Sequence, residues 1–472
     1  MEKLLARQRE IKELQRAYNS EKSEFITILG RRRIGKTFLV HSFFGNKFDF
    51  HYTGVRGMTT EQQLENFAVA LEEYGGPLFK KKLHNWIDAF RQLRLLLEQK
   101  RRKKRKVVFI DEMPWIDSKQ SQFIIALENF WNGWANMQGD IVFVACGSST
   151  SWMTDKIEAN QGGLHNRVTS RIFLRPFTLS ETEEYLHGHG CNWERYEILR
   201  CYMIIGGVPY YMSLIDPRMS LAQNVDRLFF QKKAVLENEF DELYNALFSS
   251  ADKYISIVNV LSQTNEGLSR EEISQKTKIE GGRLTVMLRN LELSDFISAY
   301  QKFNNKKKEQ TYRLTDFYTL FYFRFIENLS TADNQFWTHR QNNPAINSWQ
   351  GTAFEQVCLA HLQQIKQALG IAGMATAASA WRSREKGNKR QIDLLIDRAD
   401  KFINLCEMKF AQEPYVITKA YEMTVRERAA IFRDESQTRK SFIFTFITPF
   451  GVAHNSHYGL VQNDITAEDL FV

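Results

Sequence analysis

The segment Gly30–Thr37, GRRRIGKT, has the residue types and spacing that hold a chain of phosphates. Its glycines let backbone N–H groups close around phosphate oxygens, and a helix starting at once adds the positive end of its dipole. Lys36 is placed to reach the β and γ phosphates, and the Thr37 hydroxyl to hold Mg²⁺. We therefore expect ATP with Mg²⁺ as the ligand. The expected nucleotide contacts in this stretch are Gly30, Arg33, Ile34, Gly35, Lys36, Thr37 and Phe38.

Two adjacent acids, Asp111 and Glu112, directly follow the apolar run Val107–Ile110. In open α/β sheets, ligands bind at the carboxyl ends of the strands. Asp111 is expected to bind Mg²⁺, directly or through water, and Glu112 to polarise the attacking water. The alternative is an acidic turn without function, which the phosphate-binding segment upstream disfavours.

Polar and basic residues further along are candidates for sensing the γ-phosphate. The apolar run Ile141–Ala145 is soon followed by two serines, and Ser148 or Ser149 is the candidate sensor. Arg167 or Arg171 is a candidate arginine finger, acting in cis or from a neighbouring subunit. Both arginines are equally compatible with an ordinary surface role.

A second set of charged residues lies near the C-terminus. Asp393 falls in the apolar run Ile392–Ile396, and Glu407 and Lys409 follow at the end of a later run. Glu407 and Lys409 are two residues apart, so they share one face of a strand. Because Mg²⁺ prefers carboxylate oxygens, Asp393 and Glu407 are candidate metal ligands. Lys409 is a candidate for positioning a metal-activated water.

The elements that must position the phosphate-binding residues alternate between strands and helices. Strands are expected at Glu24–Leu29, Val107–Ile110 and Ile141–Ala145, and helices at Arg9–Tyr18, Phe38–Phe44, Thr60–Gln99 and Ser121–Trp134. This alternation predicts a parallel sheet with helices on both faces.

After Pro176 the pattern is mainly helical to about residue 245. Three helices are then expected within 253–293, followed by the strands Phe296–Phe303 and Gln310–Leu314 around a lysine-rich tip. That order is typical of a winged helix. The polar segment Gln341–Pro344 is interpreted as a linker. Beyond it, helices at Gly351–Leu369 and Pro414–Phe432 are expected with strands at 392–396, 402–407 and 440–447.

Composition excludes several classes of protein. The chain has 472 residues and 43% hydrophobic residues, which suggests about three soluble domains. No apolar run is long enough for a transmembrane helix, so no membrane partner is expected. The five cysteines form no CxxC pair, which favours reduced thiols in a cytoplasm. A net charge of +8 permits contact with nucleic acid, and the basic run Lys100–Lys106 is either a solvated element end or a phosphate-contacting patch.

Several ordered motifs resemble one family of ATPases. These are GRRRIGKT, IDEMPWID, ACGSS, NRVTSRIFLRPFTLSE and GGVPYYM, together with Arg9-Glu10 before the first and YRLTD near residue 312. They look like the archaeal-type ATPases of the AAA+ superfamily, close to the signal-transduction ATPases with numerous domains (STAND). The resemblance implies that Pro209, within GGVP, lies near the nucleotide in a helical lid. The alternative is an ordinary helix terminator with Gly and Pro in their usual places.

The C-terminal part resembles the PD-(D/E)xK restriction-nuclease core. Asp393 followed by Glu407-Met408-Lys409 matches its acid and E-x-K, and Glu355 matches the acid that this fold often places on its first helix. The sequence departs from the pattern at Ile392, where the proline is missing. Residues 345–472 hold 15 Lys+Arg and 14 Asp+Glu, a balance that gives no electrostatic attraction to DNA.

We therefore expect a multidomain α/β protein: a P-loop ATPase core over 1–180, a helical lid over 181–245, a winged helix over 246–330 and a nuclease-like α/β domain over 345–472. The first functional hypothesis is an ATP-hydrolysing switch that controls a metal-dependent nuclease acting on DNA, with Glu112, Glu355, Asp393, Glu407 and Lys409 as catalytic residues. The second is a nucleotide-regulated switch that binds DNA or a partner protein and has an inactive nuclease-like domain. Val286, Arg289 and Asn290 are candidate recognition positions. A metabolic kinase is disfavoured because no acceptor site is evident, and the oligomeric state stays open.

Overall fold

The computed structural model describes residues 4–100, 105–118, 120–158, 164, 166–301, 303, 310–329, 333–341, 343–383 and 390–472. Most of the basic run Lys100–Lys106 and all of Lys306–Lys308 lie outside these residues. The chain divides into two compact units: Met1–Arg175 with Leu293–Asp295, and Pro176–Glu292 with Phe296–Val472. The finer division into four domains stays a prediction.

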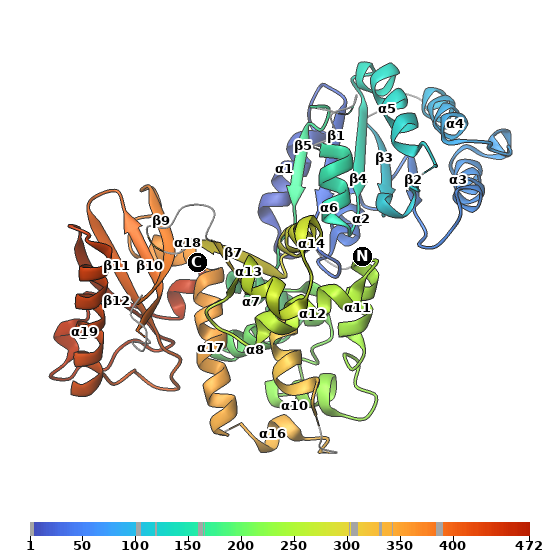
Figure 1. Ribbon diagram of the computed structural model, residues 1–472. Helices are drawn as coiled ribbons and strands as arrows, with labels where there is room; N and C mark the ends of the chain where they lie inside the picture. Colours follow the sequence, from blue (N-terminus) through green and yellow to red (C-terminus); the bar gives the residue numbers. More distant parts are fainter. Residues whose placement is uncertain are drawn as a thin grey trace. The chain divides into compact units, whose positions relative to one another are not determined.

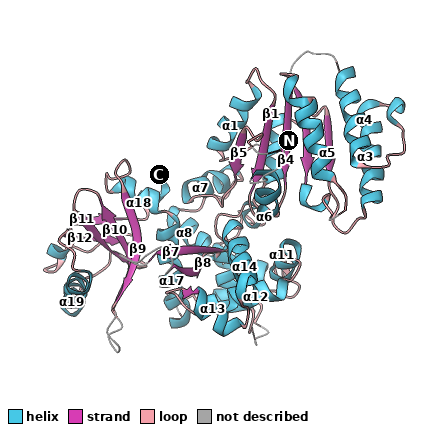
Figure 2. Ribbon diagram, turned by 45° about the horizontal axis from the view of Figure 1, so that its top comes forward, coloured by secondary structure: helices cyan, strands magenta, loops and turns pink. Residues whose placement is uncertain are grey.

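The first unit is built on a five-stranded sheet of order β2-β3-β4-β1-β5, in which every pairing is parallel. Figure 2 shows its strands with helices to either side. The strands are β1 (Glu24–Leu29), β2 (Phe50–Thr53), β3 (Lys106–Asp111), β4 (Ile141–Cys146) and β5 (Ser170–Phe173). The helices are α1 (Gln8–Tyr18), α2 (Lys36–Phe44), α3 (Thr60–Gly75), α4 (Trp86–Gln99), α5 (Phe123–Gly133) and α6 (Thr150–Met153). The predicted doubly covered parallel sheet is confirmed.

Alternating side chains of the buried strands supply two separate cores. Phe25 and Phe143 pack on one face with apolar residues of α3, α4 and α5, whereas Ile26 and Val142 pack on the other with residues of α1 and α2. Successive strand residues point to opposite faces, so runs that are apolar throughout are what two covered faces require. This packing holds the carboxyl ends of β1, β3 and β4 along one edge.

The second unit begins with short helices. They are α7 (Leu179–Gly188), α8 (Arg195–Ile205), α9 (Pro209–Ser213), α10 (Leu221–Val225) and α11 (Glu239–Leu247). Gly207 lies between α8 and α9, where its carbonyl accepts a 2.6 Å hydrogen bond from the Phe177 N–H. A Cβ at Gly207 would lie 2.0 Å from the Phe177 carbonyl oxygen, so only glycine fits there.

Three helices and the two predicted strands follow, with an additional short strand between the first and second helix that the sequence did not predict. The helices are α12 (Ala251–Ser262), α13 (Arg270–Thr277) and α14 (Gly281–Leu293). The sheet has the order β6-β8-β7, with β6 (Leu268–Ser269), β7 (Ile297–Gln301) and β8 (Gln310–Leu314). We call these three strands the wing sheet.

The C-terminal part is a mixed five-stranded sheet of order β13-β12-β11-β10-β9. Its strands are β9 (Thr376–Arg382), β10 (Gln391–Arg398), β11 (Phe402–Met408), β12 (Ser441–Ile447) and β13 (Asn463–Ile465). Strands β9, β10 and β11 pair antiparallel, and β11, β12 and β13 pair parallel. The helices are α17 (Pro344–Ala360), α18 (Leu362–Ala368) and α19 (Lys419–Ser436), of which α19 lies beside the sheet in Figure 1.

The segment just before the predicted linker Gln341–Pro344 is anchored to neighbouring helices. It contains α16 (Phe336–His339), and it follows α15 (Phe317–Phe321). The buried carboxylate of Asp226 accepts hydrogen bonds from the backbone N–H groups of Trp337 (2.7 Å) and Thr338 (3.1 Å). The buried Trp337 ring packs edge-on against Phe321 and Trp349 of α17. The N-terminal part of α17 is therefore tied to the helices that precede it.

Within the described ranges, the helices are all too short or too polar to cross a membrane. All five cysteines are described, and each is buried and free.

Candidate functional site

The phosphate-binding segment forms a tight loop between β1 and α2. Gly30 has φ +141°, and a Cβ there would lie 2.5 Å from the Leu174 carbonyl oxygen. Arg33 (φ 73°) and Gly35 (φ 87°) also adopt left-handed backbone. Helix α2 begins at Lys36, so its first N–H groups lie at the end of this loop. The loop and the helix end together present the donors that bind a phosphate chain.

The Lys36 side chain is folded onto its own loop. Its ammonium group donates hydrogen bonds to the carbonyl oxygens of Gly30 (2.7 Å) and Arg31 (2.9 Å). Burial lowers the pKa of Lys36, while the nearby Cys146, Glu112 and Asp111 act in the opposite direction. The amine thus lies at the loop, close to the acids Asp111 and Glu112.

The two other predicted loop contacts differ in exposure. Ile34 is buried in the core beneath α2, so only its backbone could reach a phosphate. Phe38 is 40% exposed and its ring is therefore available at the surface.

The predicted metal ligands Thr37 and Asp111 are brought together. The Thr37 hydroxyl donates a 2.7 Å hydrogen bond to Oδ2 of Asp111, at the end of β3. A hydroxyl and a carboxylate oxygen at this separation are hard oxygen donors, so the pair fits Mg²⁺.

Glu112 and Ser148 also meet. Oε2 of Glu112 accepts hydrogen bonds from the backbone N–H (3.1 Å) and the hydroxyl (2.9 Å) of Ser148, just beyond β4. Glu112 has φ 46°, a left-handed conformation that is uncommon for a non-glycine residue and often marks a functional position. Of the two serines proposed as sensors, Ser148 is the one that contacts the acid.

The predicted arginine finger and lid residue are not joined to this cluster by the described contacts. Arg167 is exposed, and Arg171 on β5 is 52% exposed and lies 4.0 Å from Glu158. Pro209 is the first residue of α9 in the second unit. The proposed roles of all three stay predictions.

The C-terminal acids lie on neighbouring elements. The antiparallel register pairs Leu394 with Cys406, which sets Asp393 opposite Glu407. Burial, followed by the nearby Asp393, raises the pKa of Glu355, on α17, to about 7. Burial also raises the pKa of Asp393, against the opposing charge of Arg313. Three acids distant in sequence therefore share one electrostatic environment.

Two residues that sequence reasoning missed occupy the carboxylate of Glu407. The guanidinium of Arg428 donates to Oε1 (2.5 Å) and the Tyr421 hydroxyl to Oε2 (2.6 Å); both lie on α19. The Lys409 ammonium lies 5.4 Å from the centre of the Tyr421 ring. Within the described ranges, no three His, Cys, Asp or Glu side chains are arranged to hold a metal. In this conformation the C-terminal residues thus do not fit a divalent cation.

The candidate recognition positions on α14 differ in their contacts. Val286 is 56% exposed and Arg289 is exposed, whereas the Asn290 amide donates a 2.8 Å hydrogen bond to the Tyr254 hydroxyl. Val286 and Arg289 are thus more exposed than Asn290.

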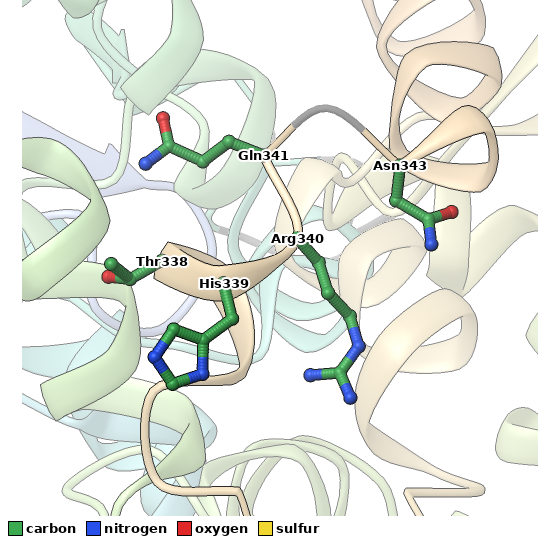
Figure 3. A pocket seen from close by; sticks show the side chains of 5 residues that line it. All are labelled: Thr338, His339, Arg340, Gln341 and Asn343. Carbon is green, nitrogen blue, oxygen red and sulfur yellow. The ribbon is translucent and has the colours of Figure 1, made fainter.

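A separate open cavity of about 430 Å³ lies beside α16. Figure 3 shows the side chains that line it: Thr338, His339, Arg340, Gln341 and Asn343. Arg340 is paired with Asp333 at 2.8 Å, and Asn343 caps the first turn of α17. These side chains serve the local structure, and the candidate sites described above lie elsewhere.

Comparisons with known proteins agree with the first of these sites. Residues 4–215 match the model of a family described as an ATPase domain predominantly from Archaea. An uncharacterised protein of Methanocaldococcus jannaschii is 25% identical over 365 residues, which cover 76% of this chain and 77% of that protein.

Among solved structures, a Walker-type ATPase of Pyrococcus abyssi is similar in fold. It has a TM-score of 0.51 and 15% identity, over 68% of this chain and 96% of that chain. The ORC2 protein of Aeropyrum pernix matches with a TM-score of 0.43 and 14% identity, over 72% of this chain and 96% of that chain. The loop geometry, the acidic pair and the family match together support an ATP-binding P-loop ATPase domain over residues 4–215, similar to this family.

Proposed function

We propose that the protein is an ATP-hydrolysing molecular switch whose nucleotide state controls the C-terminal domain, a nuclease-like domain that acts on DNA. ATP with Mg²⁺ binds at the loop Gly30–Thr37 of the first unit. The segment α12–β8, which follows the ATPase and precedes the C-terminal domain in the sequence, acts as a winged helix.

Each candidate residue of the first unit has a separate role in ATP hydrolysis. Lys36 leaves its loop carbonyls to contact the β and γ phosphates, and Thr37 and Asp111 hold Mg²⁺. The metal, when bound, neutralises charge that develops on the phosphates. Glu112 orients the attacking water, and Ser148 fixes the rotamer of Glu112 through its two hydrogen bonds.

The observation that carries the nuclease-like assignment is the meeting of Glu355, Asp393 and Glu407. They come from α17, β10 and β11, and both Glu355 and Asp393 have raised pKa values because of burial. Gathering acids in a partly buried place costs folding free energy. Such a cost is typical of functional sites and is not required of a scaffold.

One observation favours the second candidate, a nucleotide-regulated binding switch with an inactive C-terminal domain. Both carboxylate oxygens of Glu407 are occupied by Arg428 and Tyr421. If that pairing persists in every nucleotide state, Glu407 is a structural residue. The protein would then act through contacts of α14, where Val286 and Arg289 are exposed, with DNA or a partner protein.

The test is cleavage of plasmid and single-stranded DNA with Mg²⁺ or Mn²⁺, with and without ATP. The variants are Lys36→Ala and Glu407→Ala, with the exposed Lys47→Ala and Glu413→Ala as matched controls. Cleavage that disappears in Glu407→Ala and changes its ATP dependence in Lys36→Ala supports the first candidate. ATP turnover without cleavage under every condition would reject the nuclease and leave the binding switch.

A further inference from the structure

The wing sheet docks on the edge of the C-terminal sheet. The backbone N–H of Phe303, just after β7, donates a 3.0 Å hydrogen bond to the carbonyl oxygen of Ala380 on β9. The Phe303 ring packs edge-on against Phe432 of α19 at 5.0 Å and joins the hydrophobic core of the C-terminal sheet. Glu266, beside β6, forms an ion pair with Arg382 of β9. A backbone bond, an apolar contact and an ion pair thus hold the two sheets together.

Beneath this contact, the wing sheet places an arginine beside the acids. Arg313 of β8 and Asp393 of β10 line the same small cavity, of about 70 Å³. Arg313 is only 8% exposed, and within the described chain its Nε atom has no hydrogen-bond partner. A buried guanidinium with an unused donor is costly unless negative charge lies nearby. The positive charge of Arg313 acts to lower the pKa values of Asp393 and Glu355.

The charges around the acids are balanced without a metal. Three acids, Glu355, Asp393 and Glu407, share their surroundings with three cations, Arg313, Lys409 and Arg428. Arg428 belongs to the same domain as the acids, whereas Arg313 comes from the wing sheet. A divalent cation entering this set would face uncompensated positive charge, and the cavity is too small for a phosphodiester as well.

We propose that the wing sheet is an inhibitory cap on the C-terminal site, with Arg313 standing in the place of a bound divalent cation. The inference rests on the proposed nuclease-like function and adds how the site is kept closed. Undocking of the wing sheet from β9 removes Arg313, leaves the acids in excess and opens the site to a metal ion and to DNA. Glu407 stays paired with Arg428 and Tyr421 when Arg313 is withdrawn, so the opened site offers the carboxylates of Asp393 and Glu355.

The experiment measures binding of Mn²⁺ alone to the full chain without nucleotide, from the electron paramagnetic resonance signal of free Mn²⁺. Arg313→Met removes the charge and keeps an apolar side chain in the buried position. The matched control is Arg283→Met, an exposed arginine on α14. We expect Arg313→Met to lower the Mn²⁺ dissociation constant at least tenfold, Arg283→Met to leave it unchanged, and the gain to disappear in Arg313→Met with Asp393→Asn.

A second variant opens the cap without touching the acids. Arg382→Glu places like charges at the partly exposed Glu266–Arg382 pair, and the double change Glu266→Arg with Arg382→Glu restores an opposite pair. We expect the single change to tighten Mn²⁺ binding severalfold and the double change to return it to the wild-type value. This arm also covers the case in which Arg313→Met fails to fold.

The outcomes separate the cap from the nuclease-like function. Asp393-dependent Mn²⁺ binding that is equally tight in wild type, Arg313→Met and Arg382→Glu overturns the cap and leaves the metal site standing. Absence of Asp393-dependent Mn²⁺ binding in every variant overturns both. Weaker binding in Arg313→Met would show that Arg313 supports the site, and would also overturn the cap.

Discussion

Replacing His361 with glutamine should alter the pH dependence of stability in the second unit. The His361 ring follows α17 and is 1% exposed. Its Nε2 accepts a 2.9 Å hydrogen bond from the Leu179 N–H at the start of α7, and its Nδ1 lies 2.9 Å from the Val357 carbonyl oxygen. With one nitrogen accepting and the other facing a carbonyl, the neutral ring with its proton on Nδ1 satisfies both contacts.

The magnitude follows from the pKa. Burial lowers the pKa of His361 from 6.5 to about 4. The unfolded chain therefore takes up a proton at a pH where the folded protein does not, so acid favours unfolding. The stabilising contribution is complete above pH 6.5 and is lost as the pH falls toward 4. Between pH 8 and pH 5 the linkage amounts to about 2 kcal/mol.

Chemical denaturation at pH 8 and pH 5, followed by tryptophan fluorescence, measures the difference between wild type and His361→Gln. The penalty of the substitution should be about 2 kcal/mol smaller at pH 5 than at pH 8. Glu355 titrates with the opposite sign, because its raised pKa favours the folded state in acid, but it is present in both proteins and cancels in the difference. An equal penalty at both pH values would refute the reasoning, as would an NMR titration that gives His361 a pKa near 6.5.

Two further predictions follow from single positions. Gly207→Ala should destabilise the second unit by about 3 kcal/mol in denaturant titrations, because its Cβ would meet the Phe177 carbonyl oxygen at 2.0 Å. Gly282→Ala, whose Cβ meets no atom within 4 Å, is the control and should be neutral or slightly stabilising. Glu112→Gln should keep ATP binding in a fluorescent-nucleotide titration while phosphate release falls by about 100-fold or more, and normal turnover would exclude Glu112 as the group that orients water.

The parts of the fold that the sequence predicted well are those with strong local patterns. The runs Glu24–Leu29 and Gln310–Leu314 coincide with β1 and β8. The first is an almost uniformly buried run and the second largely alternates between buried and partly exposed residues, so each strand has clear ends. The strands β2 and β5 were missed, since four residues are too few to show a period. The single expected helix over Thr60–Gln99 is two helices, α3 and α4, because Gly75, Gly76 and Pro77 interrupt it.

In the candidate sites, too, only the contacts that follow from a local sequence motif could be predicted. The contact of Thr37 with Asp111 could be predicted because parallel strands bring their carboxyl ends to one edge. The placement of Arg313 beside Asp393 and the contact of Arg428 with Glu407 could not be predicted, since each depends on how separate elements dock. Arg313 lies in the YRLTD motif and Arg428 in none, but neither position points to the acids, and the sequence holds 63 Lys and Arg residues from which to choose.

Helix α17 runs without interruption from an aromatic cluster around Trp337 to the acids of the C-terminal sheet. Trp349 packs in the aromatic cluster with Trp337, and Glu355, six residues later, reaches the acids of the C-terminal sheet. Six residues of α-helix rise about 9 Å, and each residue turns the helix by about 100°. Inserting or deleting one residue between Trp349 and Glu355 would rotate the acid out of its cluster while the tryptophan stayed in place. Homologous chains that keep both environments should therefore vary in amino-acid identity along this stretch but never in its length.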